Sequence, residues 1–176
     1  MKILVTAFKP FNMLNNNYSE EVLKYIKNVD KYVLDVVYDK CFLELKEHFN
    51  LNEYDFIIAL GEARSRTDIM LETTALNLSS CSIKDNLGIL KQNETIDFNV
   101  CDKLNTLVDI KNLENLIKFS NDAGKFVCNN LYFHLLKEYQ KKALFIHIPN
   151  CFDQVDEYQK YASLIEKIIN ILKGEH

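Results

Sequence analysis

The stretch NDAGKFVCNNLYFHLLKEYQKKALFIHI, Asn121 to Ile148, encodes a helix followed by a buried strand. Apolar residues recur at helical spacing as far as Tyr139, and Asn121 and Asp122 are good helix N-caps. The closing run ALFIHI, residues 143–148, is apolar except for one histidine, which is typical of a strand covered on both faces. This unit predicts an α/β protein.

The rest of the chain repeats this alternation. We expect further strands at Lys2–Ala7, Tyr32–Val37, Asp55–Leu60 and Ile69–Leu78, and helices at Ser19–Ile26, Phe42–Leu51, Leu113–Phe119 and Tyr158–Leu172. Residues 79–109 keep no sustained period, which predicts mostly irregular chain with room for a small hairpin. Strands that alternate with helices favour a mostly parallel sheet with helices on both faces.

Composition narrows the class of protein. With 176 residues, 48% hydrophobic and 26% charged, the chain fits one globular domain over residues 1–176. A net charge of −4 argues against a nucleic-acid partner, and no apolar run is long enough for a membrane span or a signal peptide, so we expect a cytoplasmic protein. Five cysteines without a C-x-x-C pair indicate reduced thiols, so we expect neither a metal nor another cofactor.

Cys128 falls in the first turn of the expected helix. Unpaired backbone N–H groups and the helix dipole favour an anion there, which lowers the pKa of a thiol from about 8.5 toward neutrality. The same N–H groups can hold an oxyanion. Cys128 is therefore either a nucleophile or a small buried hydrophobic residue, the usual state of an intracellular cysteine at helical spacing.

His147 is a polar ring inside an apolar strand. It is either a hydrogen-bonded core histidine or a general base for Cys128. Glu72, in the run IMLETTALNL, either faces solvent or orients the imidazole. Because ligands bind beyond the carboxyl ends of parallel strands, we expect residues 8–11 and 61–68 to converge there with the cysteine and the histidine.

Several blocks of this sequence resemble the pyroglutamyl peptidases, cysteine enzymes that remove an N-terminal pyroglutamate from peptides. The blocks are ILVTAFKPF at 3–11, GEARSRTDIMLETTALN at 61–77, NDAGKFVCNN at 121–130 and FIHIPNCFDQV at 145–155. The resemblance implies a three-layer αβα sandwich, a thioester acyl-enzyme, small pyroglutamyl peptides as substrates and a possible homo-oligomer. It also implies the catalytic residues, which are Glu72, Cys128 and His147.

The resemblance further implies a ring-binding pocket formed by Phe8, Phe11, Glu62 and Val127. A pyroglutamyl ring has no charged α-amine, so an apolar slot with a few hydrogen bonds suits it. Without the resemblance, the two phenylalanines are equally consistent with ordinary core packing.

Two positions depart from the family's usual pattern. Glu62 stands where the family usually has glutamine, and we hypothesise that Lys9 neutralises it. The segment SCSIKDN, Ser80 to Asn86, lacks an arginine that is common there, in the pattern D-A-R-I-P-D-N. These departures keep an alternative function open, that of a catalytically weak or inactive homologue that binds pyroglutamyl or similar termini.

Overall fold

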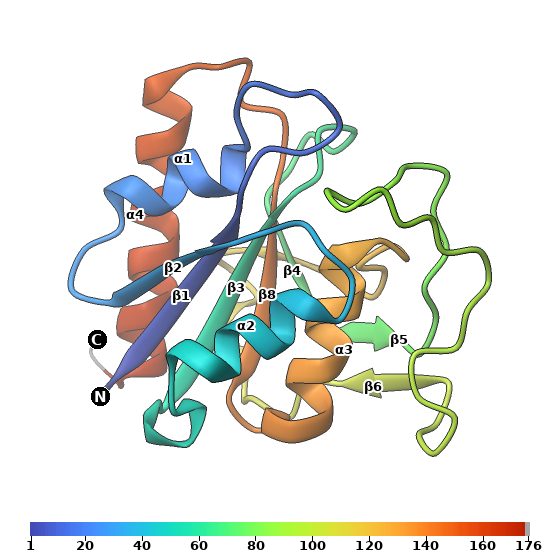
Figure 1. Cartoon of the computed structure of the whole chain (residues 1–176). Coiled ribbons are helices and arrows are strands. Elements are labelled where there is room, and N and C mark those ends of the chain that lie inside the picture. The colour runs from blue at the N-terminus through green and yellow to red at the C-terminus, as the bar shows by residue number, and fades with distance from the viewer. Residues whose placement is uncertain (175–176) are drawn as a thin grey trace.

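The computed structural model describes residues 1–174, so residues 175–176 of the expected domain lie outside it. Figure 1 shows how strands and helices alternate along the chain. The strands are β1 (Ile3–Phe8), β2 (Asp30–Leu34), β3 (Phe56–Glu62), β4 (Met70–Glu72), β5 (Thr74–Leu76), β6 (Lys103–Asn105), β7 (Lys118–Ser120) and β8 (Ala143–Ile148). The α-helices are α1 (Tyr18–Tyr25), α2 (Lys40–His48), α3 (Val127–Tyr139) and α4 (Val155–Leu172), with 3-10 turns at Leu51–Glu53 and Lys111–Leu113.

The main sheet has six strands in the order β2-β1-β3-β8-β4-β7. The strands from β2 to β8 run parallel, β4 runs antiparallel to β8, and β7 runs parallel to β4. The expectation of an α/β fold with a mostly parallel central sheet is confirmed. Strands β5 and β6 form a separate antiparallel pair.

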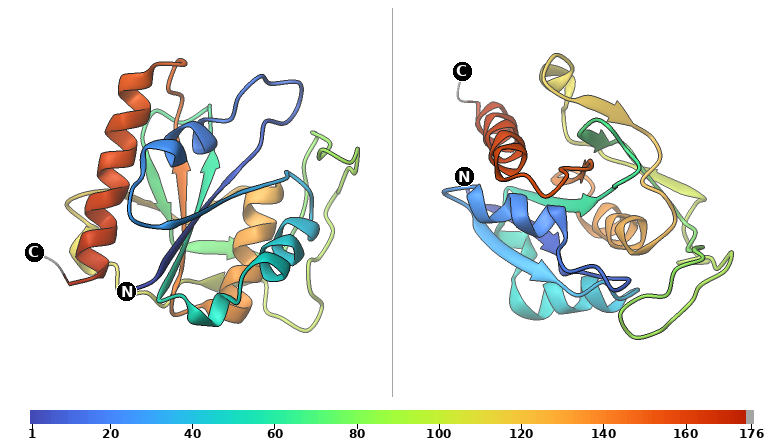
Figure 2. Two further views of the ribbon diagram at one scale, coloured as in Figure 1. Left: turned by 60° about the vertical axis from the view of Figure 1, so that its left-hand side comes forward. Right: turned by 90° about the horizontal axis from the view of Figure 1, so that it is seen from above.

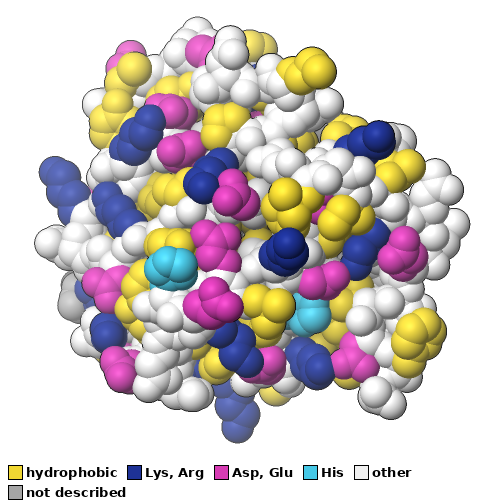
Figure 3. All heavy atoms as spheres, in the orientation of Figure 1, with side chains coloured by type: hydrophobic (Ala, Val, Ile, Leu, Met, Phe, Trp, Pro, Cys, Tyr) yellow, Lys and Arg dark blue, Asp and Glu magenta, His cyan; other side chains and the backbone are white. Residues whose placement is uncertain are grey.

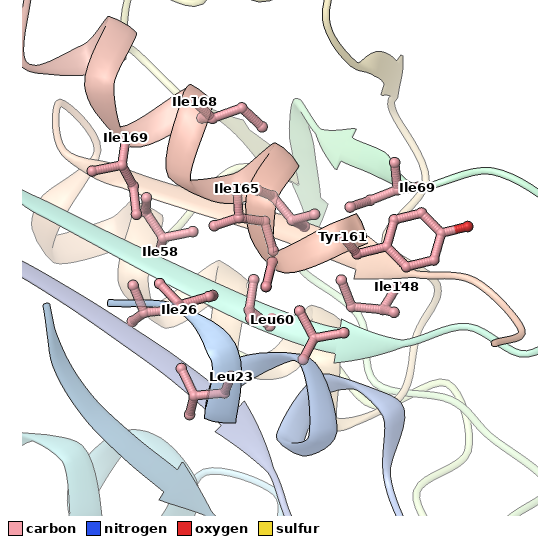
Figure 4. Close-up of a cluster of buried hydrophobic side chains, with 14 of the residues drawn as sticks. Leu23, Ile26, Ile58, Leu60, Ile69, Ile148, Tyr161, Ile165, Ile168 and Ile169 are labelled. Carbon is pink, nitrogen blue, oxygen red and sulfur yellow. The ribbon is translucent and has the colours of Figure 1, made fainter. Parts of the chain in front are cut away.

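Helices cover both faces of the main sheet, α1 and α4 on one side and α2 and α3 on the other (Figure 2). On β3, Ile58 and Leu60 pack toward α4, whereas Ile57 and Ala59 pack toward α3. Figure 4 shows Ile165 and its neighbours on α4 lying over the first pair. Burial of an isoleucine or leucine side chain in these layers contributes roughly 1.5–3 kcal/mol relative to exposure.

The prediction that Ile69–Leu78 forms one continuous strand is wrong. The segment is divided at Thr73 into β4 and β5, which belong to different sheets. The backbone N–H of Thr73 donates to the Ser120 carbonyl at 2.7 Å, and its own carbonyl accepts from the Thr106 N–H at 3.0 Å. Partners from two distant segments therefore bend the chain out of the main sheet immediately after Glu72.

The expected helix at Leu113–Phe119 is also wrong. A single 3-10 turn, Lys111–Leu113, is followed by strand β7, which pairs with β4. The side chains of Leu113 and Ile117, whose spacing predicted the helix, are both buried without one. The edge of β4 offers unpaired backbone groups, and pairing with them outweighs continued helix.

Charges on the surface are mixed. On the face drawn in Figure 3, Lys and Arg side chains lie interspersed with Asp and Glu side chains, in keeping with the net charge of −4. Over residues 1–174, no helix is both long enough and apolar enough to cross a membrane.

Candidate active site

Strands β8 and β4 bring His147 and Glu72 together. Glu72 is fully buried, and its Oε1 lies 2.7 Å from His147 Nδ1. Because a carboxylate only accepts hydrogen bonds, the proton belongs on Nδ1 and leaves Nε2 as the basic nitrogen. Glu72 therefore orients the imidazole and does not face solvent.

Arg66 is a site residue that sequence reasoning missed. Its Nη1 donates to Glu72 Oε1 at 2.6 Å, and its Nη2 donates to the Asp122 carbonyl at 2.6 Å. A buried carboxylate is costly unless it is paired, so Arg66 compensates the burial of Glu72 and ties β4 to the segment before α3. The sequence offered one indication of this role, the position of Arg66 in the GEARSRTD block, but an arginine there is equally consistent with an exposed loop.

Helix α3 begins later than its capping residues suggested. The N-cap is Phe126, with no side-chain capping bond, so the expected caps Asn121 and Asp122 are wrong. Asp122 Oδ1 instead accepts from the Gly124 N–H at 3.0 Å and closes a turn before the helix. Cys128 is consequently the second residue of α3, still within the first turn as expected.

The Cys128 sulfur lies against β3 at Gly61. A Cβ atom added to Gly61 would lie 2.8 Å from Cys128 Sγ, closer than real carbon atoms approach. Gly61 is also the register partner of His147 in the β3–β8 pair. The missing side chain therefore lets the thiol reach the sheet at the level of the imidazole.

Burial dominates the ionisation of this thiol. Desolvation, followed by the negative charges of Glu62 and Glu72, raises the pKa of Cys128 to about 12. Its backbone hydrogen bond and Arg66 act in the opposite direction but contribute less. The expectation of a pKa lowered toward neutrality is wrong, because desolvation of the thiol and the nearby carboxylates outweigh the helix start. With this pKa the thiol keeps its proton at neutral pH, and it could act as a nucleophile only with the help of a base.

Cys128 and His147 open onto one cavity of about 110 Å³. Its lining residues are Phe8, Phe11, Asn17, Val36, Glu62, Ala123, Gly124, Phe126, Val127, Cys128 and His147. The four expected binding residues are all among them, while Glu72 lies behind the imidazole. Sequence reasoning missed Phe126, whose ring packs on Phe11 with centroids 5.6 Å apart, because an aromatic residue at helical spacing is usually a core residue.

The cation beside Glu62 is Arg64, which donates from Nε to Glu62 Oε1 at 2.7 Å. Lys9 pairs instead with Asp35 at 3.0 Å, so the hypothesis that Lys9 neutralises Glu62 is wrong. Lys84, in the segment that departs from the family pattern, is exposed. Within residues 1–174, no group of three or more His, Cys, Asp or Glu side chains is placed to hold a metal ion.

Comparison with known proteins gives one consistent family. The sequence model described as Pyroglutamyl peptidase matches residues 1–173. A "Pyrrolidone-carboxylate peptidase" of Thermosipho melanesiensis is 32% identical, over 97% of this chain and 94% of the relative, and one of Thermoanaerobacter sp. is 35% identical, over 85% and 82%.

Solved structures agree. The pyrrolidone carboxyl peptidase of Fervidobacterium islandicum superposes with a TM-score of 0.85 at 27% identity, covering 99% of both chains. The pyroglutamyl peptidase I of Bacillus amyloliquefaciens gives a TM-score of 0.80 at 26% identity, over 93% of this chain and 91% of that one.

Proposed function

This chain belongs to the pyroglutamyl peptidase family, and we propose that Glu72, Cys128 and His147 are the triad with which it removes N-terminal pyroglutamate from small peptides. One observation carries the assignment of the triad. Cys128 and His147 line the same small, mainly aromatic and aliphatic cavity, and Glu72 is bonded to the far side of the imidazole.

The apolar walls of the cavity suit an uncharged lactam ring. Phe8, Phe11 and Val127 supply the hydrophobic surface, and Asn17 and Glu62 supply polar groups in the wall. An ordinary N-terminal residue would bring a charged α-amine into this space and lose its hydration. We therefore propose that the cavity selects the ring by excluding charge.

Acylation begins with the protonated thiol. His147 Nε2 takes the Cys128 proton as the sulfur attacks the carbonyl carbon that follows the ring, forming a C–S bond. The oxygen becomes an oxyanion, and the first N–H groups of α3, which have no partner within the helix, are the donors for it. The C–N bond then breaks as the imidazolium gives its proton to the leaving amine.

Deacylation repeats these steps with water. His147 takes a proton from water, the oxygen attacks the thioester, and the C–S bond breaks with return of the proton to the Cys128 sulfur. Each step passes through an imidazolium, which the Glu72 carboxylate stabilises through the Nδ1 hydrogen bond. Arg66 holds that carboxylate in place.

We also propose that the enzyme works in the cytoplasm. All five cysteines are free thiols, which suits a reducing compartment. The homo-oligomer implied by the family resemblance is tested by size-exclusion chromatography with light scattering.

The activity is tested with a fluorogenic pyroglutamyl amide. We expect turnover by the wild-type chain and a loss of about 10³-fold or more in Cys128→Ala. Cys101→Ala, which removes an exposed thiol, is the matched control and should retain activity. The corresponding alanyl amide, with a free α-amine, should not be cleaved.

Binding without turnover would replace this proposal with the alternative of an inactive homologue. It would be detected as a rise in Tm with pyroglutamyl peptide in the absence of product. Turnover that survives Cys128→Ala would exclude the proposed nucleophile.

A further inference from the structure

Glu62 places a buried carboxylate in the wall of the cavity. Its side chain is only 2% exposed, its Oε1 accepts from Arg64 Nε at 2.7 Å, and its Oε2 accepts from the Tyr18 backbone N–H at 2.7 Å. A carboxylate removed from water is stable only when other donors replace the water. Arg64 is the cationic one of these two donors.

The Arg64 guanidinium also reaches the segment that precedes α1. Its Nη2 donates to the Asn16 carbonyl at 3.2 Å and to Asn16 Oδ1 at 2.9 Å. Its Cζ lies 4.0 Å from the centre of the Tyr18 ring, and Nη1 donates to the Tyr18 hydroxyl at 3.2 Å. One side chain just beyond the end of β3 thus holds the residues on both sides of Asn17.

Asn17 closes the loop that carries part of the cavity wall. We call residues 9–17 the first loop. Asn17 lines the cavity, and its Nδ2 donates to the Lys9 carbonyl at 3.1 Å, which joins the two ends of the first loop. Phe11 lies on this loop and also lines the cavity. At the other side, Asn16 Nδ2 donates to Asp153, which follows the strand of His147.

We infer that Arg64 is a positioning residue that, paired with Glu62, clamps the first loop against the cavity and thereby sets the affinity for the ring. The inference rests on the proposed function, because the ring is its ligand. Arg64 touches neither the thiol nor the imidazole in any hydrogen bond, so its loss should raise KM and leave kcat nearly unchanged.

A double-mutant cycle tests the pair with the pyroglutamyl amide. Arg64→Ala leaves the Glu62 carboxylate without its cation, and we expect KM to rise about tenfold with kcat changed by less than about threefold. In the Glu62→Gln background a neutral amide needs no cation, so Arg64→Ala should then raise KM by about threefold or less. An equal cost in both backgrounds overturns the pairing.

Limited digestion with chymotrypsin tests the clamp without any substrate. We expect faster cleavage after Phe11 and Leu14 in Arg64→Ala than in the wild type. Lys9→Ala is the matched control, because it removes a cation from the same loop whose ion pair with Asp35 is about half exposed and worth little. Digestion of Arg64→Ala at the wild-type rate overturns the inference.

Arg64→Lys keeps the charge without the fork, and it should give intermediate KM and digestion rates even if Arg64→Ala does not fold. Wild-type rates in Arg64→Lys for both measurements would also overturn the inference. The experiments distinguish failure of the proposed function from failure of the inference about Arg64. A wild-type chain without turnover ends the proposed function while digestion still reports on the clamp, and turnover with an unchanged loop ends only the inference.

Discussion

Burial controls the ionisation of the Cys128 sulfur. Desolvation raises its pKa to about 12. Below the pKa the thiolate fraction grows about tenfold per pH unit, so alkylation of Cys128 by iodoacetamide should accelerate continuously from about pH 7 to about pH 10. Mass spectrometry of the labelled peptide measures the rate, with Cys128→Ala separating it from the other thiols. A rate that levels off near neutrality would indicate a low pKa instead.

Gly61 makes room for that sulfur. A Cβ there would lie 2.7 Å from Phe145 Cζ and 2.8 Å from Cys128 Sγ, so Gly61→Ala must displace one of them. Because a displacement of about 1 Å at a reacting atom can cost about 10²-fold, we expect kcat to fall by roughly that factor. Steady-state kinetics on the pyroglutamyl amide checks this, with thermal melting to verify folding. Wild-type kcat in Gly61→Ala would mean that the sulfur reacts from elsewhere.

Helix α3 is held in place by hydrogen bonds from its own first residues. Asn129, which follows the nucleophile, is buried, and its Oδ1 accepts from the Leu76 N–H at 2.8 Å. Its Nδ2 donates to the carbonyls of Leu76 at 2.9 Å and Leu78 at 3.0 Å. Tyr132, on the same helix, donates from its hydroxyl to the Glu72 carbonyl at 2.8 Å. Helix α3 is thus tied through Asn129 to the end of β5 and through Tyr132 to Glu72 at the end of β4.

This anchoring predicts a stability cost at the level of the element. Asn129→Ala removes the side-chain partner of three part-buried backbone groups, and we expect the free energy of unfolding to fall by about 2 kcal/mol. Urea denaturation measures the change. Asn115→Ala, which removes an exposed asparagine, is the control and should shift stability by less than about 0.5 kcal/mol. Equal effects of the two substitutions would contradict the anchoring.

Folding shields many thiol and phenol groups of the molecule from water. Desolvation is the first cause of a raised pKa for a set of thiols and phenols, which are Cys41, Cys128, Cys151, Tyr38, Tyr54, Tyr132, Tyr158 and Tyr161. Their pKa values are higher in the folded chain than in the unfolded chain. The stability linked to them is therefore complete below the unfolded values and is lost as pH rises toward the folded ones.

Stability should consequently decline from about pH 9 upward. Urea denaturation in reducing buffer at about pH 8, 9, 10 and 11 measures the decline. Cys151→Ala removes one of the raised groups, whose pKa is about 12, and should make the decline less steep. A profile that stays level between about pH 9 and about pH 11 would contradict this account.

The sequence by itself determined the α/β class and most strands and helices, and its resemblance to the family pointed to the three residues of the proposed triad. It could do so because apolar periodicity reports burial locally and because Cys128 and His147 lie in compact motifs. The region after Glu72 was different. The short strands β4, β5 and β7 form only through pairing with distant segments, which local spacing does not record.

Only the tertiary structure decided how the site is held together. Glu72 and His147 are 75 residues apart in the chain, and whether they meet depends on the order of the strands. The partner of Glu62 is Arg64 rather than Lys9 because loop geometry, not charge alone, selects the partner. The pKa of Cys128 is raised rather than lowered because burial is a property of the assembled fold, whereas the helix dipole that favoured a low pKa can be read from a single stretch.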